Sequence, residues 1–104
     1  MSLYLLKILL PDKKIYNDKV VSMTITGENG QLSILANHAP MTAMMVEGPI
    51  VIKTEQEIIE GIAGKGILKV GREESVVMVH SFKWLNDKTD EDAAIEAEES
   101  DSLL

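Results

Sequence analysis

Residues 28–44 read ENGQLSILANHAPMTAM, and this segment contains the most informative pattern in the chain. A turn led by Gly30 opens it, and a short apolar run follows at residues 32–35. A His-Ala-Pro corner at residues 38–40 then leads into a second apolar run. Gly, Pro and Asn favour the tight backbone geometry of turns. The segment therefore predicts two β-strands joined by a corner.

The same alternation of short strands and turns continues on both sides of this segment. Residues 21–26 alternate apolar and polar side chains with a period of two, which is typical of a half-buried strand. The other apolar runs are residues 3–10, 32–35, 41–46, 50–52, 58–63, 67–70 and 76–80. Gly, Pro, Asn or Asp separates most of them. This spacing predicts an all-β sandwich.

The composition limits the size and the class of the protein. A chain of 104 residues, 45% of them hydrophobic, is expected to form one domain with a modest core. There is no cysteine, so disulfides and thiolate metal sites are excluded. No apolar run approaches the roughly 20 residues of a membrane-spanning helix. We interpret the first ten residues as a strand and not as a signal peptide.

The negative charge is concentrated at the end of the chain. Residues 87–104 contain eight acids and one base, which accounts for the whole net charge of −7. The preceding 86 residues contain nine acids and nine bases. Because this body is neutral, it lacks the basic surface that nucleic-acid binding requires. We therefore expect no nucleic-acid partner.

The amino-acid composition changes after Trp84. Residues 87–99 are rich in Asp, Glu and Ala, and Thr89 stands three residues before Asp92 as an N-cap signal. Apolar residues are sparse in this segment. The sequence predicts a β-sandwich domain at residues 1–85, followed by a short acidic tail at residues 86–104 that is partly helical.

Two small motifs have simple structural interpretations. His38 and His80 are the only histidines, whereas a zinc site needs three or four ligands, so we expect no metal. We interpret His38 as a corner residue that hydrogen-bonds the backbone and His80 as a packing or surface residue. Gly64-Lys65-Gly66 fails the spacing of a phosphate-binding loop. We interpret it as a strand distortion where two backbones approach closely.

The methionines allow two interpretations. Met41, Met44 and Met45 follow the His-Ala-Pro corner. Methionine fills irregular gaps in cores and also suits adaptable binding surfaces. Either these side chains lie in the core, or one or two of them face outward and form an apolar docking patch.

The order and spacing of these segments resemble the epsilon subunit of the F-type ATP synthase, which is called delta in mitochondria. The resemblance runs from about Tyr4 to Val79 and is most specific at residues 30–40, which resemble the family's G-E-L-G-I-L-P-G-H-A-P pattern. It implies a flattened sandwich of two antiparallel sheets with about ten strands. Two departures stand out: the family often has an acid where Gln31 stands, and Lys65 interrupts a Gly-Gly pair.

The resemblance also implies a non-catalytic function. The family's domain sits on the foot of the gamma subunit and touches the polar loops of the membrane c-ring, so that torque passes between ion flow and ATP synthesis. It implies no cofactor, no small-molecule substrate and a peripheral position at the cytoplasmic face of the bacterial plasma membrane. The residues matched to the ring-facing loop are Glu28, Asn29, Gly30, Gln31 and Leu32. Those matched to the gamma-facing segment are His38, Ala39, Pro40, Met41, Thr42 and Met44.

Two other classes of function remain open at this stage. A free-standing β-sandwich adaptor would bind a peptide through an exposed sheet edge. A small enzyme would need a spatial catalytic set that no sequence motif reveals. Co-purification with a large ATPase would distinguish an ATP synthase subunit from a free-standing adaptor.

Overall fold

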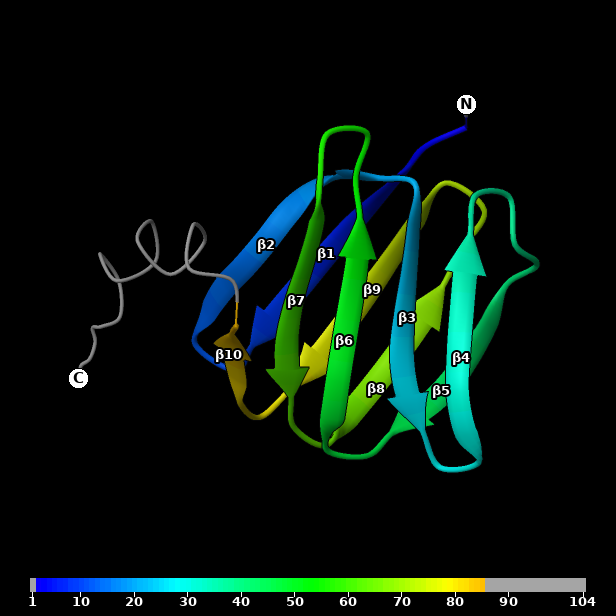
Figure 1. Cartoon of the computed structure of the whole chain (residues 1–104). Coiled ribbons are helices and arrows are strands. Elements are labelled where there is room, and N and C mark those ends of the chain that lie inside the picture. Colours follow the sequence, from blue (N-terminus) through cyan, green and yellow to red (C-terminus); the bar gives the residue numbers. More distant parts are fainter. Residues whose placement is uncertain (1, 86–104) are drawn as a thin grey trace.

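The computed structural model describes residues 2–85, which form ten β-strands and no helix (Figure 1). The strands are β1 (Tyr4–Leu10), β2 (Lys13–Val20), β3 (Ser22–Gly27), β4 (Gly30–Leu35), β5 (Met41–Met45), β6 (Gly48–Lys53), β7 (Ile58–Ala63), β8 (Gly66–Val70), β9 (Glu74–Val79) and β10 (Phe82–Trp84). No helix able to cross a membrane is therefore found in this part of the chain. The helix expected within residues 86–104 lies outside the described residues.

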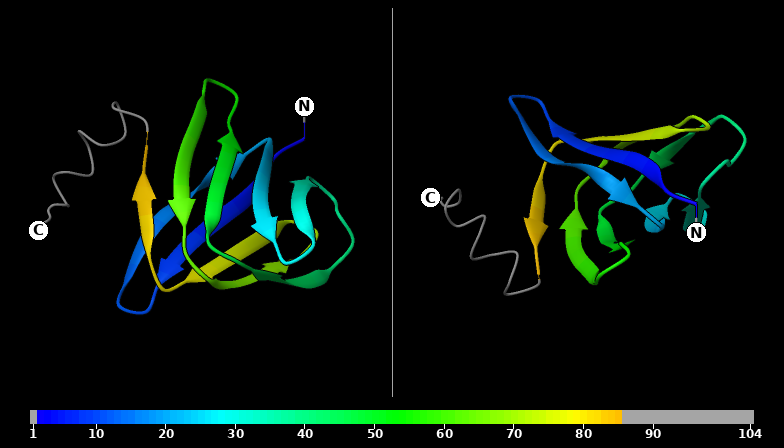
Figure 2. Two further views of the ribbon diagram at one scale, coloured as in Figure 1. Left: turned by 60° about the horizontal axis from the view of Figure 1, so that its bottom comes forward. Right: turned by 90° about the horizontal axis from the view of Figure 1, so that it is seen from above.

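The strands form two facing layers, as the view from above in Figure 2 shows. One layer contains β10, β7, β6, β3 and β4, and the other contains β5, β8, β9, β1 and β2. The prediction of an all-β sandwich with about ten strands is confirmed. Antiparallel pairing also holds, with the exception of β1 and β9, which run parallel over residues 5–9.

The two layers are halves of one hydrogen-bonded sheet. The link between them is the pairing of β3 with β5, which consists of Gly27 opposite Met45. Beyond this point β3 pairs with β4 along its length and with β6 over residues 22–24. The sheet thus folds over at Gly27, and the folded halves enclose the core.

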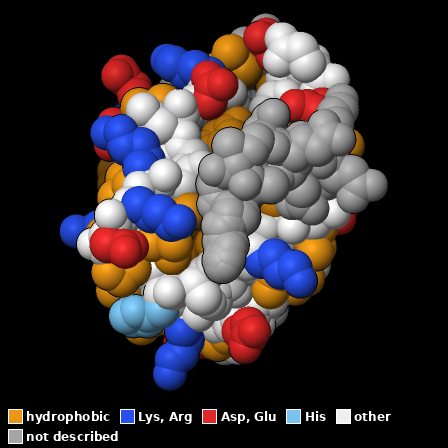
Figure 3. Space-filling model, turned by 90° about the vertical axis from the view of Figure 1, so that its left-hand side faces the viewer, with side chains coloured by type: hydrophobic (Ala, Val, Ile, Leu, Met, Phe, Trp, Pro, Cys, Tyr) orange, Lys and Arg blue, Asp and Glu red, His pale blue; other side chains and the backbone are white. Residues whose placement is uncertain are grey.

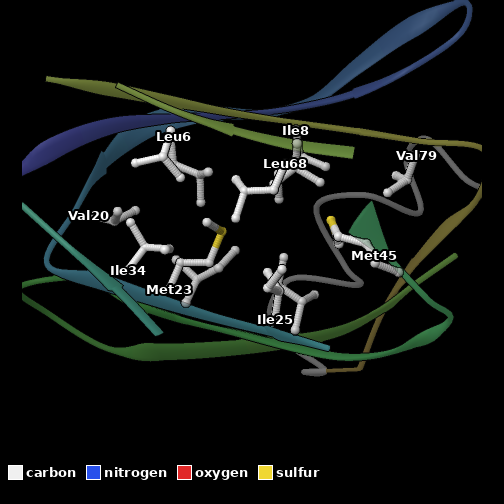
Figure 4. Close-up of a cluster of buried hydrophobic side chains, with 14 of the residues drawn as sticks. Leu6, Ile8, Val20, Met23, Ile25, Ile34, Met45, Leu68 and Val79 are labelled. Carbon is white, nitrogen blue, oxygen red and sulfur yellow. The ribbon is translucent and has the colours of Figure 1, made fainter. Parts of the chain in front are cut away.

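Alternating side chains from both halves fill the core. Met23 and Ile25 of β3 are fully buried, as the period-two pattern predicts, and Figure 4 shows them below Leu6 and Ile8 of β1. Completely burying one Leu, Ile or Met side chain contributes about 1.5–3 kcal/mol. The buried hydrophobic residues are Tyr4, Leu6, Ile8, Val20, Met23, Ile25, Ile34, Met45, Ile50, Ile52, Ile59, Ala63, Leu68, Val70, Val77 and Val79. All of them precede Leu85.

A buried hydrogen bond ties the two layers together. The Tyr4 hydroxyl donates to the Ile34 carbonyl oxygen over 2.8 Å, and Tyr4 is only 2% exposed. Burial raises the pKa of Tyr4 above its ordinary value, so the hydroxyl keeps its proton. This bond satisfies the polar atom of the largest side chain that is enclosed in the core.

Aromatic side chains close the side where β2 and β10 end the sheet. The Tyr16 and Trp84 rings meet edge to face with centroids 5.9 Å apart, and Phe82 packs edge to face on Trp84 at 4.6 Å. Burial, together with the charges of Asp18 and Glu57, raises the pKa of Tyr16 to about 12. These contacts bring the two edge strands together without backbone pairing.

The Gly-Lys-Gly segment is a close approach of two backbones, as interpreted from the sequence. A Cβ atom on Gly66 would collide with the Met78 carbonyl oxygen, and one on Gly64 would collide with the Ser81 hydroxyl. Between them, the Lys65 carbonyl accepts a hydrogen bond from the His80 amide at 3.3 Å.

We predict that Tyr4→Phe destabilises the domain by about 1–2 kcal/mol, because the buried Ile34 carbonyl loses its cross-layer donor. Tyr16→Phe is the matched control: its ring packs at the partly exposed edge, and we expect a change within about 0.5 kcal/mol. Urea unfolding of both variants measures the difference. Equal losses would mean that the cross-layer bond contributes nothing specific.

We also predict that a chain ending at Leu85 folds cooperatively, because the buried core precedes that residue. The thermal melt, followed by near-UV circular dichroism, should remain a single sharp transition. A molten signal from the shortened chain would assign residues 86–104 to the core.

Candidate functional site

The candidate functional features of residues 2–85 are exposed turns and outer sheet faces. Residues 2–85 contain no group of three or more His, Cys, Asp or Glu side chains placed to hold a metal. His38 Nδ1 donates to the Ala39 carbonyl at 2.7 Å, as expected of a corner residue. His80 is exposed just after β9. The candidate site is therefore sought among exposed turns and outer sheet faces.

The predicted ring-facing residues lie at the β3–β4 hairpin. Gly27 pairs with Gly30, which leaves Glu28 and Asn29 as the two turn residues. Gly30 has φ 118°, a conformation that side chains with a Cβ rarely adopt. Residues 28–31 are exposed, whereas Leu32 is half-buried and packs against the core. The accessible part of this site is thus residues 28–31.

The predicted gamma-facing residues divide between two places. His38, Ala39 and Pro40 lie in the loop before β5, at the end of the strand remote from the β3–β4 hairpin. Along β5, Met41 is half-buried and packs against the core, while Met44 is 51% exposed. Thr42 is exposed on the same outer face as Met44, because side chains two residues apart on a strand share a face.

An apolar row crosses the outer face beside Met44. Met44 pairs with Ile67, Ile67 with Met78, and Met78 with Leu9, so these four side chains lie across four adjacent strands. We call them the methionine row. Met44 and Met78 are 51% and 38% exposed, and the other two are half-buried. Of the three methionines after the His-Ala-Pro corner, Met45 lies in the core and Met41 packs against it, whereas Met44 faces outward.

Sequence reasoning did not find Ile67, Met78 and Leu9 as members of this row. Each of these residues is an apolar side chain at an outward position of its strand, which the sequence alone indicates. That the three lie in one row depends on the register of β8, β9 and β1. The next row of outward side chains on the same strands is partly charged, because it contains Lys69, Val76 and Lys7. The Lys7 ammonium lies 3.5 Å from the Glu74 carboxylate.

The hairpin and the methionine row adjoin each other. Met45, which follows Met44, pairs with Gly27, which precedes Glu28. A polar turn and an apolar face therefore meet at the lower end of the molecule in Figure 1. One domain can present the two surfaces to two different partners at once.

One free sheet edge, that of β2, is poorly suited to binding a peptide strand. The edge strand β2 carries Lys13, Lys14, Asp18 and Lys19, all exposed. Charged side chains on an edge discourage the addition of another strand. Figure 3, which faces the side of β2 and β10, shows basic and acidic side chains interspersed on this surface.

Comparison with known proteins identifies a family. Residues 4–85 match the model of the ATP synthase delta/epsilon chain, β-sandwich domain. The chain is 32% identical over 80 residues to the ATP synthase epsilon chain of Sulfurimonas denitrificans, covering 76% of this chain and 62% of that protein. It is 33% identical over 96 residues to the epsilon chain of Natranaerobius thermophilus, covering 90% and 67%. The chain thus spans about two thirds of such relatives.

Solved structures share the fold. A chain in the mitochondrial ATP synthase of Euglena gracilis (OSCP, F1 and c-ring) superposes with a TM-score of 0.77 at 16% identity, covering 92% of this chain and 64% of that one. A chain in the central stalk and c-ring of the Tetrahymena thermophila enzyme gives 0.67 at 14% identity, covering 99% and 80%.

Proposed function

The chain belongs to the ATP synthase delta/epsilon chain family, and from this premise we propose that it is a non-catalytic subunit of the central stalk of a rotary F-type ATP synthase. In this role it couples the gamma subunit to the membrane c-ring while ion flow drives ATP synthesis. Its contribution is interface free energy and rigidity, and it needs no cofactor and no small-molecule substrate.

The observation that carries this proposal is the meeting of two exposed surfaces at one end of the sandwich. The methionine row offers an apolar face whose unbranched side chains adapt to a partner, and we assign it to gamma. The hairpin at residues 28–31 offers a polar turn, and we assign it to the polar loops of the ring. His38, Ala39, Pro40 and Thr42 would lie at the margin of the gamma contact.

The folded sheet suits a part that transmits torque. The Gly27–Met45 pairing holds the hairpin beside the methionine row, so a force applied at one surface reaches the other through backbone hydrogen bonds. The buried Tyr4–Ile34 bond resists sliding of one layer over the other. Because interior packing is dense, relative motion of the layers would disrupt many contacts.

We place the protein at the cytoplasmic face of a bacterial plasma membrane, held there by the complex. The relatives named above are bacterial epsilon chains, which supports a bacterial source. Co-purification from the native membrane is the direct experiment: the tagged protein should retain gamma and the ring. Retention of an unrelated peptide ligand alone would favour the adaptor.

We predict that Met44→Glu weakens binding to gamma by at least tenfold while the domain stays folded, because a carboxylate would be desolvated at an apolar interface. Met44 is 51% exposed in the free domain, so the substitution adds no buried charge there. Ile58→Glu is the matched control, because Ile58 is 54% exposed and lies at the opposite end of the sandwich. Titration with purified gamma measures both affinities.

Met41→Glu should behave differently, because Met41 is half-buried against the core. We expect a lower melting temperature for this variant. Unchanged gamma binding by a folded Met44→Glu protein would remove the methionine row from the interface.

We further predict that residues 86–104 do not restrain ATP hydrolysis. The charge of −7 carried by residues 87–104 would be repelled by an acidic surface, most strongly at low salt. The reconstituted complex should hydrolyse ATP equally fast with the full chain and with a chain stopped after Leu85. A several-fold faster rate without the tail, with assembly intact, would identify it as a brake.

A further inference from the structure

Thr26 lies at the point where the folded sheet passes from one half to the other. The β3–β6 pairing covers residues 22–24 of β3 and ends before Thr26, and the β3–β5 pairing lies just after it, at Gly27. The two pairings therefore leave Thr26 between them. Its own contacts determine how closely β3 follows the bend that leads from β5 into β6.

Two hydrogen bonds connect Thr26 to this bend. The Val46 amide donates to the Thr26 carbonyl over 3.1 Å, and the Thr26 hydroxyl donates to the Pro49 carbonyl over 3.0 Å. Pro49 has no amide hydrogen and cannot donate to β3, so the Thr26 side chain supplies the second bond. We call these two bonds the Thr26 clasp, because they hold β3 to the residue that follows β5 and to the start of β6.

Gly48 leaves the space that the Thr26 side chain occupies. A Cβ on Gly48 would lie 2.6 Å from the Thr26 hydroxyl oxygen, 2.9 Å from its Cβ and 3.0 Å from its Cγ2. A larger residue at position 48 would therefore displace the hydroxyl from the Pro49 carbonyl. The half-buried threonine is thus fitted into the bend, whereas a freely rotating surface hydroxyl would need no such space.

The Thr26 clasp lies at the base of the hairpin that we assign to the ring. Only Gly27 separates Thr26 from Glu28, the first residue of the exposed part, and Thr26 pairs with Gln31 on the returning strand. On the other side of the clasp, β5 carries Met44 at one end of the methionine row. The clasp therefore stands between the hairpin and the methionine row.

We propose that Thr26 is a positioning residue, whose hydroxyl fixes the orientation of the hairpin relative to the methionine row. This inference rests on the proposed function and adds that one side chain sets the angle between the two partner surfaces. Two-stranded ribbons twist more than wider sheets do, so a hairpin without the clasp would have to be ordered when the ring binds, at a cost in affinity. Removing the hydroxyl should weaken ring binding and leave gamma binding unchanged.

The first experiment compares Thr26→Val with Thr24→Val. Valine has the shape of threonine without the hydroxyl. Thr24 is the matched control, because its hydroxyl lies 2.8 Å from the Ser33 hydroxyl and so bonds within the hairpin and not to the bend. Each protein is assembled with gamma from its own source organism and titrated with the c-ring of that organism. Thr26→Val should bind the ring about two- to tenfold more weakly than the wild type, the range expected for one lost hydrogen bond, and Thr24→Val should bind like the wild type.

Two further readings separate positioning from general stability. Thr26→Ser should bind the ring like the wild type, because serine keeps the hydroxyl. All three variants should bind purified gamma with wild-type affinity, because the methionine row is unchanged in each of them.

A measurement on the free protein tests the orientation without any partner. The chain contains no cysteine, so spin labels on Asn29→Cys and Lys14→Cys report a single distance. Lys14 pairs with Leu9 and continues the methionine row onto β2, about four strand spacings, or about 19 Å, from β5. The distribution of label distances should be broader or shifted in Thr26→Val, and it should match the wild type in Thr24→Val and Thr26→Ser.

The inference is overturned by equal ring binding of wild type and Thr26→Val, by an equal loss in Thr24→Val, or by a Thr26→Ser protein that binds as weakly as Thr26→Val. A parallel loss of gamma binding, or an unchanged distance distribution in Thr26→Val, would overturn it as well. All of these outcomes leave the proposed function intact, because the wild-type assembly still binds the ring. Failure of the wild-type assembly to bind the ring would instead refute the proposed function, and the label distances would still decide whether Thr26 orients the hairpin.

Discussion

A single backbone pairing, Gly27 with Met45, joins the two halves of the sheet, and the arrangement of the exposed surfaces depends on it. The space there is tight, since a Cβ on Gly27 would lie 3.3 Å from the Gly30 carbonyl oxygen. This pairing brings the β3–β4 hairpin next to the last residues of β5. A polar turn and an apolar row consequently meet at one end, although they come from separate segments of the sequence.

Much of the fold follows from local chemistry. The alternation in residues 21–26 correctly predicted that Met23 and Ile25 face the core. The Asn-Gly pair correctly predicted the β3–β4 turn, because Gly30 adopts a positive φ. The close approach at Gly64 and Gly66 was also predictable, because small residues inside a strand pattern indicate backbones that come near each other.

Other features depend on tertiary contacts that no local pattern contains. The strand β2 has one fully buried side chain, Val20, so its sequence lacks the alternation that reveals a strand. β10 has only three residues and is held by pairing with β7 and by aromatic contacts. The methionine row requires the register of four strands, one pair of which is parallel. The resemblance matches Leu32 to the ring-facing loop, and the inward face of β4 places this side chain against the core.

The account predicts two partners on two adjoining surfaces of one rigid domain. Site-specific photo-crosslinking in the assembled ATP synthase tests this most directly, with a photoreactive amino acid placed at Asn29 in one protein and at Met78 in another. The probe at Asn29 should capture the c-ring, and the probe at Met78 should capture gamma. Capture of the same partner by both probes, or of neither subunit by either, would contradict the account.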